Sequence, residues 1–498
     1  MRQIVILGNY SQIQSEDDPE LLIRLDQLLS FRVPGAQYSR AFKGFVDKSG
    51  KFQRWDGVRK ILTGDLKFPT GLVPRIQQFY SEQNIQYTVQ DQRPAKSSVK
   101  PDLDNILLKL KAIGKEPYDY QLAVLDQVRL HDRGIIKSAT GSGKSLISLL
   151  ITCDLNRSTV IYVIGKDLLY QFYNLYSELL GTENVGMVGD GHCNIRNVTI
   201  ASIWTIGQAL GLKKNEILVD SEQDDETLNL DKKNDIIKMI ETAKVHQFDE
   251  CHVCACETIQ KIYKHLKSSE YIYGLSGSPW REDNADLLVE GILGKYIVNI
   301  PASYLIERGL LARPIIRFMT VPEYDGEIQN NYQSVYKKYV VENPVRNELV
   351  LKATKQIVDQ GYQTLVLFNN LSHGRILYDM IRQELPCAIL DGSDSAEERE
   401  AVKKQLTEGK IKCILASKIF EIGVDLPSLS GLVIACAGKS SIKSIQRIGR
   451  VIRKFPGKRF AAVVDFADNC KWLDKHSKIR YKVYKSEEGF DVKWNKKK

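Results

Sequence analysis

The sequence lacks the long apolar run that a membrane-spanning helix would need. It also lacks the composition of a disordered chain, because 43% of its 498 residues are hydrophobic and 26% are charged. The first eight residues begin apolar and soon turn polar, which favours a first strand over a secretory signal. We therefore expect a folded protein of the cytoplasm that makes no membrane contact.

The nine cysteines form no paired framework, as is typical of proteins from a reducing compartment. Cys251, His252, Cys254 and Cys256 lie close together in the sequence, but no second pair follows at metal-site spacing. Buried or helix-start cysteines are therefore favoured over a zinc site. The chain is too long for one hydrophobic core, so two to four domains are expected.

A glycine-rich stretch, Ser-Ala-Thr-Gly-Ser-Gly-Lys-Ser at residues 138–145, stands between two apolar runs. The pattern predicts a strand, a loop and a helix, whose backbone N–H groups and helix dipole can bind a phosphate. Lys144 is then placed to reach the β- and γ-phosphates, and the Ser145 hydroxyl to coordinate Mg²⁺. The alternative is an ordinary strand-to-helix turn.

Two neighbouring carboxylates, Asp249 and Glu250, follow a strand-like run at residues 245–248. Behind a phosphate-binding loop, Asp249 is predicted to hold Mg²⁺ and Glu250 to orient and deprotonate a water molecule. An Asp-Glu pair is also common on protein surfaces, so its position in the chain carries the prediction. Some twenty residues before the loop, the Gln121 amide is suited to read an adenine edge.

Strands alternate with helices from about residue 112 onward, which predicts parallel sheets covered on both faces. Near the end of this alternation, Arg450 and Arg453 are three residues apart and so share a helical face. Two guanidinium groups there can clamp a triphosphate. The alternative is a basic helix that faces solvent or nucleic acid. A charged segment at 213–244 is interpreted as a surface insertion.

The N-terminal region is basic, with ten Lys/Arg and three Asp at residues 32–75 and several aromatic residues among them. Basic and aromatic residues together indicate a nucleic-acid surface, with Arg54, Arg59 and Lys60 around Trp55 as candidate contacts. A small α+β core with a solvated basic face is the alternative. Residues 471–498, with ten Lys/Arg and four Asp/Glu, favour a second phosphate contact over a solubilising tail.

In their order, these motifs resemble those of superfamily-two helicases of the DECH-box kind. The resemblance rests on Tyr120-Gln121, Ala139–Ser145, Asp249-Glu250-Cys251-His252, Ser276-Gly277-Ser278, Gly423-Val424-Asp425 and Gln446-Arg447-Ile448-Gly449-Arg450-Val451-Ile452-Arg453. It implies an α/β protein with two RecA-like parallel-sheet domains in tandem, preceded by a small α+β N-terminal domain, with ATP and Mg²⁺ bound between the RecA-like domains.

The resemblance also implies roles for individual residues. Arg450 and Arg453 would be arginine fingers, Gln446 would monitor the γ-phosphate, and Asp425 would lie near the ribose. The remaining nucleotide contacts implied are Gln121, Thr140, Gly141, Ser142, Gly143, Lys144, Ser145 and Gly423, and the nucleic-acid contacts are Thr205, Ser276 and Ser278.

We expect an N-terminal DNA-binding domain (1–95), a linker (96–111), a first RecA-like ATPase domain (112–300), a connector (301–345), a second RecA-like domain (346–470) and a basic tail (471–498). Trp55-Asp56-Gly57 and residues 68–72 resemble the N-terminal domain of phage recombination helicases of the UvsW type. This implies an ATP-dependent DNA helicase that remodels forks and junctions in the cytoplasm of a bacterial host. We expect it to be a monomer. The alternatives are an RNA helicase, a restriction-system DNA translocase subunit, and a nucleic-acid-binding scaffold without hydrolysis.

Overall fold

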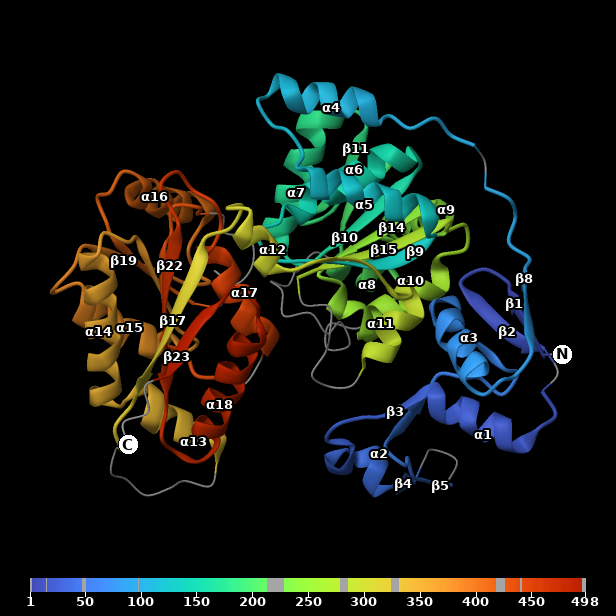
Figure 1. Ribbon diagram of the computed structural model, residues 1–498, viewed down its shortest axis with the longest axis horizontal. Helices are drawn as coiled ribbons and strands as arrows, with labels where there is room; N and C mark the ends of the chain where they lie inside the picture. Colours follow the sequence, from blue (N-terminus) through green and yellow to red (C-terminus); the bar gives the residue numbers. More distant parts are fainter. Residues whose placement is uncertain are drawn as a thin grey trace. The chain divides into compact units, whose positions relative to one another are not determined.

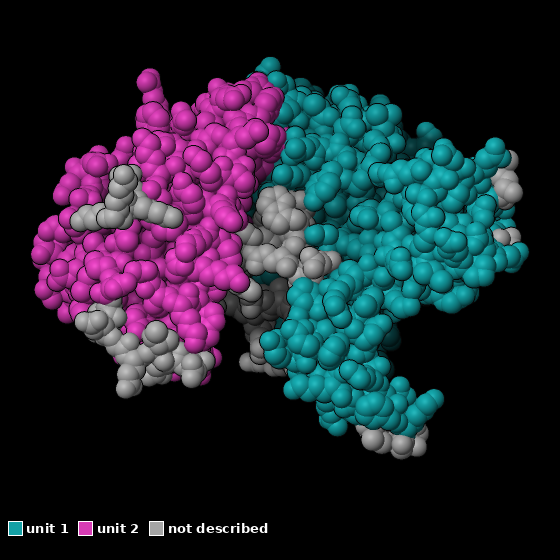
Figure 2. Space-filling model, turned by 60° about the horizontal axis from the view of Figure 1, so that its bottom comes forward, with its two compact units in different colours: residues 1–138, 144–299 teal, residues 139–143, 300–498 magenta. Residues whose placement is uncertain are grey.

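The computed structural model describes residues 2–14, 16–46, 51–96, 98–212, 228–277, 285–323, 331–417, 426–438 and 441–494. The chain folds into two compact units, shown in two colours in Figure 2. Unit 1 contains residues 1–138 and 144–299, and unit 2 contains residues 139–143 and 300–498. Across the described ranges, every helix is too short or too polar to cross a membrane.

Unit 1 is built on an eight-stranded sheet with the order β12-β11-β13-β10-β14-β15-β9-β16 (Figure 1). The strands are β9 (Arg133–Ser138), β10 (Thr159–Val163), β11 (Val185–Gly189), β12 (His192–Asn194), β13 (Val198–Ser202), β14 (Val245–Asp249), β15 (Tyr271–Ser276) and β16 (Tyr296–Ile300). Every residue of β10, β13 and β14 is buried, as expected for parallel strands covered on both faces.

The covering helices of this sheet follow its strands in the chain. They are α5 (Asp119–Leu130), α6 (Lys144–Leu155), α7 (Lys166–Leu180), α8 (Ile203–Ala209), α9 (Leu230–Thr242), α10 (Glu257–His265) and α11 (Asp286–Leu293). Isoleucine, valine and aromatic side chains from both layers form one hydrophobic core. The alternation of strand and helix that the sequence predicts is thereby confirmed for unit 1.

The N-terminal part of unit 1 has its own small sheet, with the order β7-β2-β1-β8. Its elements are β1 (Arg2–Ile6), β2 (Tyr10–Gln14), α1 (Pro19–Leu28), β7 (Lys67–Pro69), α3 (Val73–Glu82) and β8 (Tyr87–Asp91). A separate core with Ile4, Leu25, Phe68 and Ile76 lies between sheet and helices. This is the small α+β region that the sequence predicts.

A short module, residues 30–60, extends from this small sheet and is called the basic module below. It contains β3 (Ser30–Arg32), a short 3-10 helix (Ala36–Tyr38), α2 (Arg40–Lys43), β4 (Phe45–Val46), β5 (Phe52–Gln53) and β6 (Val58–Lys60). β3 pairs with β6 and β4 pairs with β5, both antiparallel. With only two-stranded ladders, the module depends on its side-chain packing for its shape.

Unit 2 contains a seven-stranded sheet, all of whose neighbouring strands are parallel, with the order β19-β20-β18-β21-β22-β17-β23. The strands are β17 (Arg313–Thr320), β18 (Thr364–Leu367), β19 (Cys387–Leu390), β20 (Cys413–Ala416), β21 (Gly431–Ile434), β22 (Phe460–Ala467) and β23 (Asp491–Trp494). The helices are α12 (Ala302–Glu307), α13 (Tyr332–Tyr336), α14 (Pro344–Asp359), α15 (Leu371–Ile381), α16 (Ala396–Thr407), α17 (Ser441–Val451) and α18 (Lys471–Ser486).

Three predicted boundaries differ from the structure. The predicted linker 96–111 includes most of α4 (Leu103–Ala112), whose Ile106 and Leu110 are fully buried. The predicted connector 301–345 contributes β17, which lies between β22 and β23 in the sheet of unit 2. The predicted tail 471–498 forms α18 and β23, because Leu473 and Tyr484 are buried against the sheet. In each case the exposed face of the element is polar or basic, and these residues make its buried apolar residues less conspicuous in the sequence.

Candidate active site

The glycine-rich loop has the predicted local structure. β9 ends at Ser138, residues 139–143 form the loop, and α6 begins at Lys144. Gly141 and Gly143 have φ angles of 89° and 79°, in the region that favours glycine. These two residues allow the loop to turn tightly before the helix, so that its N–H groups precede a helix N-terminus.

Asp249 and Glu250 lie at the end of β14, in the interior of the parallel sheet. Asp249 is 6% exposed, and Glu250 follows it with a left-handed backbone at φ 48°. A non-glycine residue in this region is uncommon and is often found at functional sites. The turn lets Glu250 Oε2 accept a 2.9 Å hydrogen bond from Ser276 Oγ, at the end of neighbouring β15.

Two basic side chains flank Glu250. The ammonium group of Lys144 lies 3.8 Å from Glu250 Oε1, and His252 Nδ1 lies 3.5 Å from Glu250 Oε2. Burial disfavours ionisation of Glu250, but Lys144, then His252 and Ser276 outweigh it and lower its pKa. Burial and the neighbouring charge of Glu250 raise the pKa of Asp249, against the smaller effect of Lys144. This sets an ionised Glu250 beside an Asp249 that lacks a sufficient counter-charge.

The predicted adenine-reading residue, Gln121, is held by a hydrogen bond within its own segment. Gln121 is 3% exposed in the first turn of α5, and its Oε1 accepts a 2.9 Å hydrogen bond from the Tyr118 N–H. This bond fixes the plane of the carboxamide, so its NH₂ group has a defined direction. The rings of Tyr118 and Tyr120 stack with centroids 5.6 Å apart, and Tyr118 is 42% exposed.

The predicted nucleic-acid contacts of the ATPase sheet differ in exposure. Thr205 is 5% exposed in α8, so its hydroxyl is not part of an open surface in this structure. The Ser276 hydroxyl donates to Glu250, which gives it a position next to the acids. Ser278, Gly423 and Asp425 lie outside the described residues.

In unit 2, Gln446 and Arg450 lie on α17 and Arg453 follows it, with all three side chains half-buried. Two buried arginines hold residues 435–438, which follow β21 in the chain. Arg346 Nη1 donates to the Ala435 carbonyl and Arg480 Nη1 donates to the Gly438 carbonyl, each at 2.7 Å. These arginines position the segment from which the predicted finger helix begins.

Sequence reasoning assigned no role to either of these arginines. Arg480 could have been found, because Leu473, Ser477, Arg480 and Tyr484 recur at the spacing of one helical face. An arginine on the apolar face of an amphipathic helix indicates a buried ion pair, and Arg480 indeed binds Asp465 twice at 2.9 Å. For Arg346 the sequence offers no comparable signal.

The basic module exposes most of its predicted contacts. Arg54, Arg59 and Lys60 are exposed, although Lys60 forms an ion pair with Asp26 at 2.6 Å. Trp55 is half-buried and its indole N–H donates to the Val58 carbonyl at 2.7 Å. The exposed rings are instead those of Tyr38 and Phe52, which are 78% and 62% exposed.

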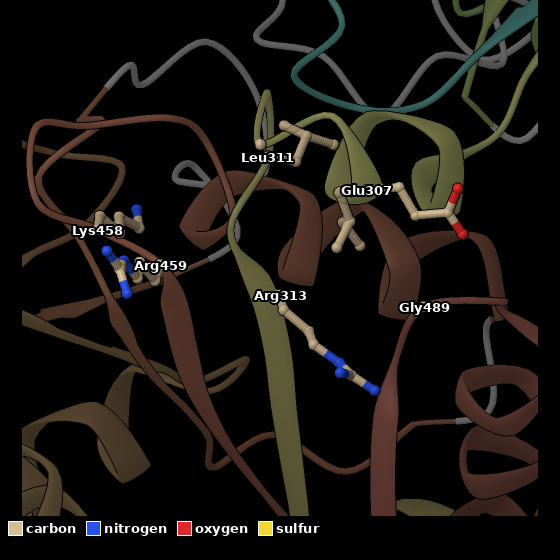
Figure 3. A pocket seen from close by; sticks show the side chains of 8 residues that line it. Glu307, Leu311, Arg313, Lys458, Arg459 and Gly489 are labelled. Carbon is tan, nitrogen blue, oxygen red and sulfur yellow. The ribbon is translucent and has the colours of Figure 1, made fainter.

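Unit 2 also contains a cavity of about 500 Å³ near the start of β17 (Figure 3). It is lined by Ile306, Glu307, Gly309, Leu311, Arg313, Lys458, Arg459 and Gly489. Burial, and secondarily Arg453, lowers the pKa of Lys458 to about 8, and its ammonium group donates to the Pro427 carbonyl at 2.9 Å. Of the predicted site residues within the described part of the chain, none lines this cavity.

Three family models match successive parts of the chain. They are DNA helicase UvsW, N-terminal, at residues 4–90; type III restriction enzyme, res subunit, at 114–281; and helicase conserved C-terminal domain, at 348–455. Their order corresponds to the basic N-terminal region, the ATPase sheet of unit 1 and the sheet of unit 2.

The ATP-dependent DNA helicase uvsW of Enterobacteria phage T4 is 24% identical over 489 residues, which cover 95% of this chain and 92% of the phage protein. A crystal structure of T4 UvsW covers 99% of this chain and 98% of its own, with 21% identity and a TM-score of 0.45. The DNA 3′-5′ translocase XPB2 of Sulfurisphaera tokodaii is 22% identical, over 68% of this chain and 78% of its own.

Dbp5 of S. cerevisiae, in a structure with RNA and ADP BeF₃, matches 78% of this chain and 93% of its own, with 14% identity and a TM-score of 0.53. This likeness concerns the fold alone, and it agrees with tandem RecA-like sheets. The family matches and the phage relative confirm the resemblance that the motifs predicted. These matches support an ATP-dependent helicase, and the chain is similar to UvsW along nearly its whole length.

Proposed function

We propose that this helicase acts on branched DNA, holding a duplex arm with its basic module while the ATPase moves along a strand. The observation that carries the proposal is the firm attachment of the N-terminal sheet to the ATPase sheet within unit 1. A Cβ on Gly71 would lie 2.1 Å from the Glu290 carbonyl oxygen, so only glycine permits the approach of the short 3-10 helix Thr70–Leu72 to α11.

Polar contacts strengthen the same attachment. Arg75 donates to both carboxylate oxygens of Glu290, with the shortest N–O distance 2.6 Å. The Tyr10 and Tyr263 rings pack with centroids 5.5 Å apart. An arm held by the basic module would therefore be pulled against a fixed point when the motor moves. The motor sheets alone provide no second anchor for a junction.

The basic module has a suitable surface for such an anchor. The exposed cations Arg32, Arg40, Lys43, Arg54 and Arg59 lie in the same module as the exposed rings of Tyr38 and Phe52. The Phe52 ring packs over Gly44, where a Cβ would lie 2.2 Å from Phe52 Cζ. Cationic side chains bind phosphates, and a ring seated on backbone can stack on a base.

For the chemistry, we infer that ATP is held by residues 140–145, that Gln121 reads its adenine, and that Glu250 activates water. Arg450 and Arg453 serve as arginine fingers and Gln446 contacts the γ-phosphate. Asp249 and Ser145 fit Mg²⁺, because a buried carboxylate with a raised pKa lacks counter-charge that a divalent cation supplies. Bound Mg²⁺ would neutralise charge on the phosphates. We place this monomeric enzyme in the cytoplasm of a bacterial host.

The test compares ATP hydrolysis and unwinding on single-stranded, duplex, forked and four-way DNA, with RNA beside them. We expect hydrolysis with any DNA that offers a strand, and unwinding mainly of forked and four-way DNA. Replacing Tyr38 and Phe52 with serine and Arg54 and Arg59 with glutamate should remove most junction unwinding and leave single-strand-stimulated hydrolysis. Equal stimulation by RNA, or junction unwinding unaffected by these changes, would contradict the proposal.

A further inference from the structure

Helix α18 (Lys471–Ser486) presents a row of lysines to solvent. Lys471, Lys475, Lys478, Lys482 and Lys485 are separated by four, three, four and three residues, and all five are exposed. At 3.6 residues per turn, they fall within an arc of about 80° of the helix surface. The row is called the lysine stripe below, and it is about 21 Å long at 1.5 Å per residue.

The opposite face of the same helix is fixed to the sheet of unit 2. Leu473, Arg480 and Tyr484 are fully buried, and the Tyr484 hydroxyl donates to Asp465 at 3.0 Å. α18 packs beside α17 and against β22 and β23 (Figure 1). The stripe is therefore mounted on a rigid element and keeps its direction without a bound partner.

The stripe is electrostatically unfavourable for the helix alone. Like charges three or four residues apart on a helix cost roughly 0.2–0.5 kcal/mol per pair, and the stripe contains four such neighbouring pairs. Asp474 is the one acidic residue of α18, and it binds Lys478 at 2.6 Å. At the N-terminal end, the Lys471 ammonium group lies 4.3 Å from the centre of the Trp472 indole. A polyanion along the stripe would relieve this repulsion.

We propose that the lysine stripe binds the phosphate backbone of DNA, without sequence preference, as a contact of unit 2 outside the ATP-binding motifs. This inference rests on the proposed function to the extent that DNA is the bound polymer. One strand of a duplex carries a phosphate about every 3.4 Å of helix axis, so a 21 Å stripe faces about six of them. Lysine, as a flexible point charge, suits such contacts because they require no fixed hydrogen-bond geometry.

The experiment measures the salt dependence of DNA binding by the full chain without nucleotide. In one variant Lys475, Lys478, Lys482 and Lys485 are changed to glutamine. A matched control changes Lys352, Lys355, Lys404 and Lys410 of unit 2, which removes the same charge from α14, α16 and the segment after α16. The slope of log affinity against log salt is negative, and its magnitude should decrease by about three to four in the stripe variant. It should change by less than one in the control.

Changing the same four lysines to arginine should keep the wild-type slope, because only charge is required. Thermal unfolding of all variants should match the wild type, since the substituted side chains lie at the surface, with Lys355 half-buried and the others exposed. An unchanged slope in the glutamine variant, or an equal drop in the control, overturns the stripe as a DNA contact and favours a solvated face or an acidic protein partner.

A duplex RNA measured in parallel separates this inference from the proposed function. If the wild type unwinds junctions and the glutamine variant keeps the wild-type salt slope on DNA, the stripe assignment is wrong and the proposed function stands. If the wild type prefers RNA, and the glutamine variant loses slope on RNA, the stripe still binds a phosphate backbone and the branched-DNA function is wrong. A wild type that binds neither polymer contradicts both.

Discussion

The two units use different chemistry to attach the helices that carry their predicted catalytic residues. In unit 1, the bond between strand and helix is neutral. Gln247 lies two residues before Asp249 on β14, and its Nε2 donates to the Ser148 carbonyl at 3.2 Å and to Thr152 Oγ1 at 2.8 Å. Both acceptors belong to α6, which begins at Lys144. One buried amide thus connects the strand of the two acids to the helix that begins at the predicted phosphate-binding lysine.

In unit 2, the corresponding attachment is ionic. Arg346 and Arg480 hold the carbonyls of Ala435 and Gly438, between β21 and α17, and each arginine is paired with a buried aspartate. Arg346 binds Asp468 at 2.7 Å and Arg480 binds Asp465 at 2.9 Å, with all four side chains nearly or fully buried. Two buried ion pairs therefore position residues 435–438, which precede the predicted finger helix.

The two kinds of attachment differ in the free energy of unfolding that is lost when one partner is removed. Loss of a neutral buried hydrogen bond costs about 1–3 kcal/mol, because the group left behind is only polar. Loss of one member of a buried ion pair costs about 3–5 kcal/mol, because an uncompensated charge remains. We therefore expect the position of the arginines in unit 2 to be more sensitive to single substitutions than that of the acids in unit 1.

The largest effects are expected from the catalytic groups themselves. Arg453→Ala from unit 2 should reduce DNA-stimulated ATP turnover by about 10³-fold or more, with nucleotide affinity less affected. Glu250→Gln from unit 1 should stop turnover and retain ATP binding. Arg459→Ala, at an exposed arginine of unit 2, is the control and should hydrolyse ATP at the wild-type rate. Wild-type turnover in Arg453→Ala would show that it is not a finger.

The second prediction breaks an ion pair of unit 2. Asp465→Leu should reduce the free energy of unfolding of unit 2 by about 3–5 kcal/mol, because Arg480 would stay buried without its carboxylate. Adding Arg480→Met to the same protein should recover most of the loss. Denaturant unfolding of the single and double variants measures both values. A double variant as unstable as the single one would show that the charge left behind is not the cause.

The third prediction breaks the neutral attachment of unit 1. Gln247→Leu should cost about 1–3 kcal/mol of unfolding free energy, since Thr152 keeps its own hydrogen bond to the Ser148 carbonyl at 3.0 Å. ATP hydrolysis should fall less than in Arg453→Ala. If Gln247→Leu costs as much as Asp465→Leu under the same denaturant conditions, the contrast between the two units does not hold.

The sequence predicts the local parts of the site well, because each motif is a short stretch with its own physical signature. The loop before Lys144 and the strand that ends at Asp249 have the predicted structure. Arg450 lies on a helix as predicted, but Arg453, predicted on the same helical face, lies beyond the end of α17. In these segments the hydrophobic pattern and the reactive residues are adjacent in the chain. The overall pairing of two parallel sheets follows from the same alternation.

What the sequence does not predict depends on contacts between distant segments. Membership of β17 in the second sheet needs its pairing with β22, whose paired residues are 147 positions further along the chain. The exposure of Phe52 rather than Trp55 depends on a hydrogen bond to the Val58 carbonyl and on space above Gly44. Composition cannot rank aromatic residues by exposure, because packing decides which ring is covered.

The smallest expected effect is a dependence of stability on pH, and it should be similar in the two units. His246 in unit 1 and His373 in unit 2 are both fully buried. Burial lowers the pKa of His246 to about 4, and burial together with Arg346 lowers that of His373 to about 3. Each histidine is therefore neutral in the folded protein at pH 6–7, whereas the unfolded chain takes up protons near pH 6.5.

Stability linked to these histidines is complete above pH 6.5 and is lost as the pH falls toward the folded-state pKa values. From pH 7 to pH 6, each should lower the free energy of unfolding by about 0.7 kcal/mol. His246→Gln and His373→Gln can each replace the Nε2–H donor, to the Ala243 carbonyl at 3.2 Å and to Asn347 Oδ1 at 3.0 Å. Hydrogen exchange in β14 and β18 at the two pH values gives the opening free energy of each unit. Each substitution should remove the pH response of its own unit only. A larger response in unit 2 that survives His373→Gln would mean that its ion pairs, and not its histidine, respond to pH in this range.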